Sequence, residues 1–359
     1  MICCDKCFSD EVLKAEIKAL DDKGDCPVCG KNDVFLYDSD VNADNTNIEE
    51  LLGNIIKIYL PERKLDKNYP EEKLGTLESR LKHDWDIFDI EESGVKNIID
   101  GVIQNAIDID DELLNGNVGI PELNSEGYLL QNSIMGLYHW EDFRKYLRNQ
   151  NIFHSKHINL ELLAEVLKDT EITIKKNTTL YRARKSSKVG FERSEMGAPP
   201  SDKATAGRAN SQGISCLYLC SSKETTIKEI RANAFDYVSI ANFRLNRDVK
   251  VLDLSIISHN SPFYTETDKV KYMINERHLR KIQNDLAKPI TSDDTELDYL
   301  PTQYISDFAK FLGYDGVKYI STFDRTAYNV ALFDADACRC TYSKNYLIGN
   351  LDYKLNPLK

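Results

Sequence analysis

Four cysteines near the start of the chain have the spacing of a metal site. Cys4 and Cys7 form one C-x2-C pair, and Cys26 and Cys29 form a second pair after 18 intervening residues. Two such pairs place four thiolates around one tetrahedral zinc ion, and two disulfides are the alternative. Because four sulfur ligands leave no position for water, the spacing predicts a zinc ion that holds structure and takes no part in catalysis.

A single carboxylate, Glu229, stands out on a helix predicted for residues 223–235. This helix follows a short apolar strand predicted for residues 213–220. The residues three and four positions away from Glu229 are all uncharged. The side chain is therefore either an ordinary exposed glutamate or one that takes its partner from elsewhere in the fold or from a ligand.

The elements that must position these residues change character along the chain. Up to residue 170 the apolar spacing is mainly helical, with helices predicted at 48–60, 71–85, 95–108, 137–150 and 158–169. Beyond it, strands are predicted at 172–184, 213–220, 237–245, 249–255, 314–321 and 329–334, and helices at 223–235, 269–282 and 302–313. Because two strands follow one another without a helix, we expect an α+β fold. Three parts are predicted: a zinc knuckle (1–40), an acidic α-helical accessory domain (41–170) and an α+β domain (171–359).

Composition limits the class of protein. Of the 359 residues, 42% are hydrophobic and 29% charged, which is typical of a globular chain. No apolar run approaches the roughly 18 residues of a membrane helix, and no signal peptide is visible, so we expect a cytoplasmic protein. Residues 1–170 contain 18 Lys and Arg against 35 Asp and Glu, whereas residues 171–359 contain 28 against 23. The acidic first part argues against direct binding of nucleic acid.

The segment RNQNIFH resembles the R-N-x4-H signature of HEPN ribonucleases. It places Arg148 and His154 at the positions of that signature. The resemblance implies a ribonuclease that uses these two side chains. The alternative is an arginine at a helix end and a loop histidine.

A longer series of motifs covers roughly residues 178–340. Its segments are, in order, LYRAR, APP with GRANSQGISCLYLCSSKETTIKEIR, TQYISDF, GYDGVKYIS and NVALFD. Together they resemble the RES domain family, which implies a catalytic domain at 171–359. The family's motif positions fall on Arg208, Tyr218, Glu229 and Ser321, with Arg182 as an additional arginine. The zinc knuckle and helices resemble the accessory domain that precedes RES or HEPN modules in some bacterial proteins.

This resemblance implies an NAD+-degrading enzyme with an ADP-ribosyltransferase-like mixed sheet. The enzyme would be a glycohydrolase or phosphorylase that cleaves the nicotinamide–ribose bond, as a bacterial toxin or phage-defence effector. NAD+ would be its substrate and not a redox cofactor, in keeping with the absence of a G-x-G-x-x-G sequence after a strand. The resemblance also implies an antitoxin or activating partner and a homodimer. A non-catalytic module that binds nucleotides is the other alternative.

Each motif residue then has an expected role. Glu229 would stabilise an oxocarbenium-like ribose, and its missing partner would be the substrate. Arg208, with Arg182 as a second donor, would bind the pyrophosphate. Tyr218 would stack on nicotinamide, and Ser321 would offer its hydroxyl to the substrate. The acidic N-terminal part would cover the basic part and keep the pocket shut until a partner displaces it.

Overall fold

A computed structural model describes most of the chain. It covers residues 1–106, 111–151, 154–255, 261–263, 268–288 and 295–351. The chain divides into two compact units, each built from two segments: 1–137 with 259–277, and 138–258 with 278–359. No helix in the described part of the chain is long and apolar enough to cross a membrane.

The boundary between the units falls near residue 137. Residues 138–170, which the sequence groups with the accessory domain, belong to the second compact unit. Within the first unit, Cys4 and Leu13 share one hydrophobic core with Ile48 and Leu81, so the cysteine-rich end and the helices pack together. The division into three functional domains stays a prediction.

A small antiparallel sheet and a helix open the first unit. The sheet has the order β1-β3-β2 (Ile2–Cys4, Val34–Asp38, Lys23–Gly24). Helix α1 (Glu11–Ala19) begins at Asp10, whose side chain accepts from the backbone N–H groups of Val12 and Leu13. This cap satisfies two amides that no helical carbonyl reaches. Leu13 and Ile17 on the same helix are fully buried.

Helices form most of the remaining first unit. They are α2 (Ser39–Asn42), α3 (Ile48–Ile56), α4 (Leu77–Trp85), α5 (Glu92–Ala106), α6 (Asp111–Asn115) and α7 (Glu126–Asn132). The short strands β4 (Leu60–Pro61) and β5 (Val118–Gly119) pair with each other in antiparallel orientation. The helices predicted near 48–60, 71–85 and 95–108 are present as α3, α4 and α5, each shorter or slightly displaced.

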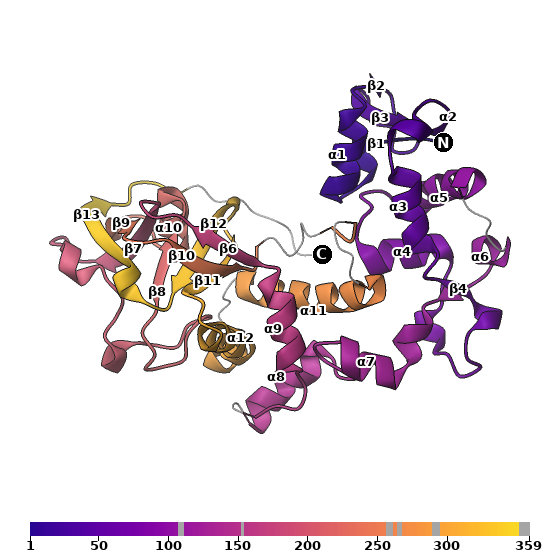
Figure 1. Cartoon of the computed structure of the whole chain (residues 1–359). Helices are drawn as coiled ribbons and strands as arrows, with labels where there is room; N and C mark the ends of the chain where they lie inside the picture. The colour runs from indigo at the N-terminus through magenta and orange to yellow at the C-terminus, as the bar shows by residue number, and fades with distance from the viewer. Residues whose placement is uncertain (107–110, 152–153, 256–260, 264–267, 289–294, 352–359) are drawn as a thin grey trace. The chain divides into compact units, whose positions relative to one another are not determined.

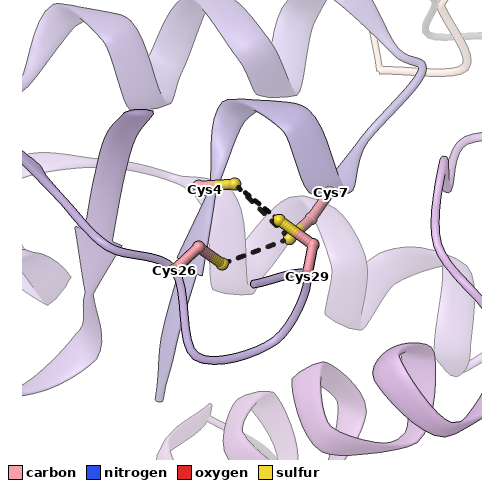
Figure 2. Close-up of side chains that lie close together, drawn as sticks. All are labelled: Cys4, Cys7, Cys26 and Cys29. Carbon is pink, nitrogen blue, oxygen red and sulfur yellow. Dashed lines mark hydrogen bonds between the residues drawn. The ribbon is translucent and has the colours of Figure 1, made fainter. Parts of the chain in front are cut away.

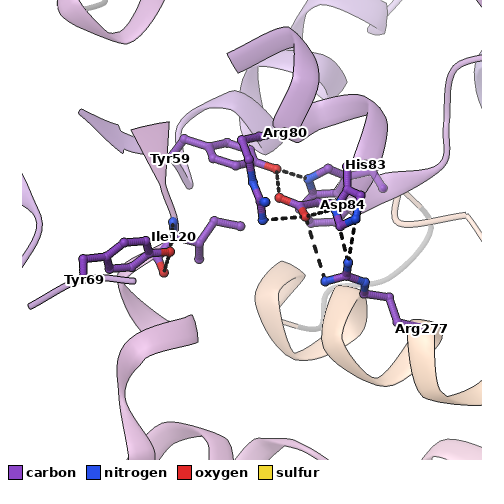
Figure 3. Close-up of polar contacts among 8 residues, drawn as sticks. Tyr59, Tyr69, Arg80, His83, Asp84, Ile120 and Arg277 are labelled. Atoms are coloured by element: carbon purple, nitrogen blue, oxygen red, sulfur yellow. Dashed lines mark hydrogen bonds and ion pairs between the residues drawn. The ribbon is translucent and has the colours of Figure 1, made fainter. Parts of the chain in front are cut away.

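A buried carboxylate ties these helices together (Figure 3). Asp84 accepts hydrogen bonds from Tyr59 at 2.9 Å and from Arg80 at 2.8 Å, and Arg277 lies 3.9 Å away. Trp85 donates to the Tyr59 hydroxyl at 2.9 Å. A buried charge needs such partners, so this network fixes α4 within the unit.

An eight-stranded sheet forms the centre of the second unit (Figure 1). Its order is β13-β9-β7-β8-β12-β11-β10-β6, and of its pairings only β10 with β11 is parallel. The strands are β6 (Glu171–Ile174), β7 (Thr179–Ser186), β8 (Leu217–Cys220), β9 (Tyr237–Leu245), β10 (Val249–Asp253), β11 (Gly316–Ser321), β12 (Asp324–Leu332) and β13 (Cys338–Leu347). Apolar residues of seven of these strands share one core, and this mixed architecture confirms the α+β prediction.

Five further α-helices are present in the described residues. They are α8 (Trp140–Asn149), α9 (Leu160–Lys168), α10 (Lys223–Glu229), α11 (Lys269–Ala287) and α12 (Leu300–Phe311). The first residues of α11 are counted with the first unit and its last ones with the second. Helix α10 is shorter than predicted: it ends at Glu229, and Arg231 then takes a left-handed backbone conformation with φ 48°. Glu229 is therefore the last residue of its helix.

Candidate functional site

The four predicted metal ligands come together in the first unit (Figure 2). Their sulfur atoms all lie within 4.8 Å of one another. The Cys4–Cys29 distance is 3.4 Å, and Cys4–Cys7 and Cys7–Cys26 are 3.6 Å each. A disulfide needs about 2.05 Å, whereas two thiolates on one tetrahedral zinc ion, each about 2.3 Å from it, lie about 3.8 Å apart. These distances fit a shared metal and exclude disulfides.

The surroundings of the thiols also fit a cation. Burial raises the pKa of Cys4 to about 12, and it raises that of Cys7 as well. Buried thiols of this kind give up their protons only when a positive charge replaces them. The chemistry of four sulfur ligands therefore suits a thiophilic ion with a structural role.

A second candidate site lies in the second unit, as a pocket of about 330 Å³. Its lining includes Arg182 from β7, Tyr218 from β8, Glu229 from the end of α10, and Arg208 from the loop before β8. The fifth predicted residue, Ser321, lies at the end of β11, buried beside the pocket. The fold thus brings together side chains that are far apart in the sequence.

Two neutral donors meet at one oxygen of Glu229. The Ser321 hydroxyl donates to Oε1 at 2.6 Å, and the Asn329 side-chain amide donates to the same oxygen at 2.8 Å. Within the described residues, Oε2 accepts from no side chain or backbone group. Glu229 therefore has partners from distant strands, but no cation among them.

The loop that carries Arg208 is held by its neighbours. The Tyr218 hydroxyl donates to Asn210 Oδ1 at 2.7 Å and accepts from the backbone N–H of Ala209 at 3.0 Å. A Cβ on Gly207 would lie 2.6 Å from that hydroxyl, so the close approach requires glycine. Burial raises the pKa of Tyr218 well above its ordinary value, which keeps the hydroxyl protonated as a donor.

The two arginines of the pocket differ in what they bind. Arg208 donates one N–H to the carbonyl of Leu286 in the last turn of α11. The side chain of Arg182 makes no hydrogen bond or ion pair with any described residue, and its Nη1 is buried. Burial, aided by the nearby charge of Arg184, lowers the pKa of Arg182 to about 10. It remains a cation at neutral pH and lacks an anion.

Some residues of this site were missed in the sequence. Asn329 contacts Glu229, although the motif NVALFD was matched as a whole and no role was assigned to its asparagine. Asn210 donates to the carbonyls of Thr205, Ser211 and Ile214, and Gln303 of α12 donates to the carbonyl of Gly207 at 2.8 Å. The GRAN and TQYISDF motifs contain both residues, so the signal was present without a role attached to it.

The pair Arg148 and His154 is arranged differently. Arg148, at the end of α8, forms an ion pair with Asp298. His154 is exposed, and its backbone carbonyl accepts from the Tyr146 hydroxyl at 3.0 Å. Among the described residues no hydrogen bond joins the two side chains. The ribonuclease prediction receives no support from this geometry.

Comparisons with known proteins bear on the second unit. In a search of curated proteins, none matches the chain. A solved structure, the M. tuberculosis MbcT-MbcA toxin-antitoxin complex, matches with 16% identity and a TM-score of 0.34, covering 51% of this chain and 91% of that chain. The sequence model described as the RES domain matches residues 179–354, which include every residue of the pocket named above. Residues 179–354 are therefore identified as a RES domain.

Proposed function

We propose that the second unit degrades NAD+ by cleaving the bond between nicotinamide and ribose. The observation that carries this proposal is the charge pattern of one pocket. Glu229 lines it with an oxygen that accepts from no described residue, and Arg182 lines it with a guanidinium that has no anion. NAD+ carries the complementary pattern, with a cationic nicotinamide ring and an anionic pyrophosphate.

The expected chemistry follows from this pattern. The C1′–N bond breaks and its electron pair leaves with nicotinamide, which needs no proton to become neutral. Positive charge grows on the ribose, and the carboxylate of Glu229 stabilises it. Water then supplies the new C1′–O bond and releases a proton, giving ADP-ribose, or phosphate supplies it and gives the 1-phosphate. These are the glycohydrolase and phosphorylase forms of the same reaction.

The other site residues have supporting roles in this proposal. Arg182 and the free N–H groups of Arg208 bind the pyrophosphate, because a planar guanidinium pairs well with phosphate oxygens. Tyr218 presents its ring to the pocket while its hydroxyl holds the loop of Arg208. Zinc is the ion we propose for Cys4, Cys7, Cys26 and Cys29, where it holds structure and takes no part in the reaction.

The biological setting is part of the same proposal. An enzyme that consumes NAD+ lowers the NAD+ content of the cell that produces the enzyme. We therefore infer a toxin or defence effector that an antitoxin or activating partner controls. Restraint by the acidic N-terminal part, and a homodimer, stay predictions of the sequence. The cytoplasm is the compartment where this substrate would be met.

The test uses the purified full chain with NAD+, in the presence and absence of phosphate. Chromatography follows nicotinamide, ADP-ribose and ADP-ribose 1-phosphate. We expect release of nicotinamide by the wild type and a loss of about 100-fold or more in Glu229→Gln, since the amide keeps the shape but not the charge. Glu224→Gln, on the exposed face of the same helix, is the matched control and should keep full activity. Equal rates for both variants would reject the site.

A further inference from the structure

Asn329 occupies a central position in the pocket wall. It lies on β12, directly opposite Tyr319 of β11 and Cys220 of β8 in the strand register. Opposed residues on neighbouring antiparallel strands project from the same face, and all three line the pocket. Asn329 is followed by three fully buried apolar residues, Val330 to Leu332. An amide in such a run needs polar partners.

The side-chain amide of Asn329 uses its Nδ2 within the protein, while its Oδ1 has no partner among the described residues. Its Nδ2 donates to Glu229 Oε1 at 2.8 Å. An ionised carboxylate can only accept, so this bond fixes which end of the amide faces Glu229. The other end, Oδ1, accepts from no described residue, and it is not one of the fully buried side-chain atoms that lack a hydrogen-bond partner. It is therefore accessible from the pocket that Asn329 lines.

Ser321, in contrast, has its only donor engaged and lies outside the pocket lining. Its single O–H donates to Glu229 Oε1, and its oxygen accepts from the backbone N–H of Phe323 at 3.2 Å. The residue is 1% exposed and does not line the pocket. The contact with substrate that the sequence assigned to Ser321 must come from another side chain. Asn329 is the neighbour with an unused acceptor.

We propose that Asn329 positions Glu229 through its Nδ2 and binds the nicotinamide–ribose half of the substrate through its Oδ1. This inference rests on the proposed function. With Oε1 held by Asn329 and Ser321, only Oε2 of Glu229 faces the growing positive charge. The substrate group that Oδ1 accepts from is a hydrogen-bond donor beside the bond that breaks, either the carboxamide of nicotinamide or a ribose hydroxyl.

Two substitutions separate positioning from packing. Asn329→Ala removes both contacts, and we expect kcat to fall about 10- to 100-fold, as for a lost hydrogen bond to a charged group. Asn329→Asp keeps the shape but puts a second carboxylate beside Glu229. Two carboxylates at this distance share a proton, so the acid limb of the pH–rate profile should move up by at least one pH unit. Ser321→Ala should lower kcat with little change in KM.

A substrate analogue identifies what Oδ1 binds. In nicotinic acid adenine dinucleotide a carboxylate replaces the carboxamide and offers no N–H. If Oδ1 binds the carboxamide, the wild type discriminates against this analogue and Asn329→Ala does so much less. If Oδ1 binds a ribose hydroxyl, the variant loses activity equally on both compounds. Asn246→Ala, on a turn of the same sheet outside the pocket, is the control and should behave as wild type.

Several outcomes would overturn the proposal. An Asn329→Ala protein that is folded by circular dichroism and keeps wild-type kcat and KM refutes both roles. An unmoved pH profile in Asn329→Asp refutes the positioning role. If the wild type releases no nicotinamide, the proposed function fails by itself. The Asn329 proposal is then decided by calorimetry with carba-NAD+: binding weakened tenfold or more in Asn329→Ala supports it, and equal binding rejects it.

Discussion

Replacing Tyr218 with phenylalanine separates two roles for this residue. The ring, which the sequence assigned to stacking on nicotinamide, stays in place. The hydroxyl, which donates to Asn210 Oδ1 and accepts from the N–H of Ala209, is lost. Asn210 and Ala209 are 6% and 5% exposed, so water cannot easily replace the missing partner. The substitution therefore tests whether Tyr218 holds the loop that carries Arg208.

The size of the effect follows from these contacts. Leaving buried polar groups unpaired costs about 1–3 kcal/mol, and for a unit of this size that lowers Tm by roughly 2–4 °C per kcal/mol. A loosened loop also misplaces Arg208, so we expect kcat/KM for NAD+ to fall about tenfold. Differential scanning calorimetry and the nicotinamide assay measure the two effects. Tyr328→Phe on β12 is the control, because its hydroxyl bonds to no described residue. Wild-type Tm and activity in Tyr218→Phe would refute the loop-holding role.

Two further predictions concern the first unit. Metal analysis should find one zinc ion per chain, which is lost in Cys26→Ser and kept in Cys3→Ala. A chelator should unfold this unit, because a structural zinc site contributes of the order of 10 kcal/mol to folding. A metal-free chain that stays folded would contradict this prediction. Burial raises the pKa of Glu276 from 4.5 to about 8, although the nearby positive charge of Arg277 acts to lower it. The folded state then binds the proton more tightly than the unfolded state, so stability falls as pH rises from about 4.5 to 8. Glu276→Gln should remove this fall and raise Tm at pH 8, whereas an unchanged difference between pH 5 and pH 8 would refute it.

The elements that sequence reasoning missed have physical explanations. Strand β13 (Cys338–Leu347) is an edge strand whose residues are mostly exposed or half-buried, so it lacks the apolar run that marks a buried strand. Helix α10 was extended to residue 235 because no glycine or proline ends it. Instead Arg231 takes up the left-handed conformation that glycine usually supplies.

The sequence was enough to select residues of the candidate site, but it could not predict which side chains contact one another there. Motif order pointed to Arg182, Arg208, Tyr218 and Glu229, and the fold places all four around one pocket. Local spacing could not supply the partners of Glu229, because Ser321 and Asn329 lie 92 and 100 positions further along the chain. Only the pairing of β11 and β12 brings those two donors to the end of α10.

The unpaired groups of the pocket also limit what it can bind. Glu229 is held by neutral donors only, so its negative charge is not cancelled by any described cation in contact with it. Arg182 is a half-buried cation, with its Nη1 fully buried, and no described anion neutralises it. A purely anionic ligand would leave the negative charge of Glu229 without a partner. A purely cationic ligand would leave the positive charge of Arg182 without one. Because burying an uncompensated charge is costly, the pocket favours a ligand that carries both charges at a fixed separation. NAD+ meets this condition, whereas neutral nicotinamide does not. Under the proposed function, cleavage would therefore weaken the interaction with Glu229 and favour release of this product.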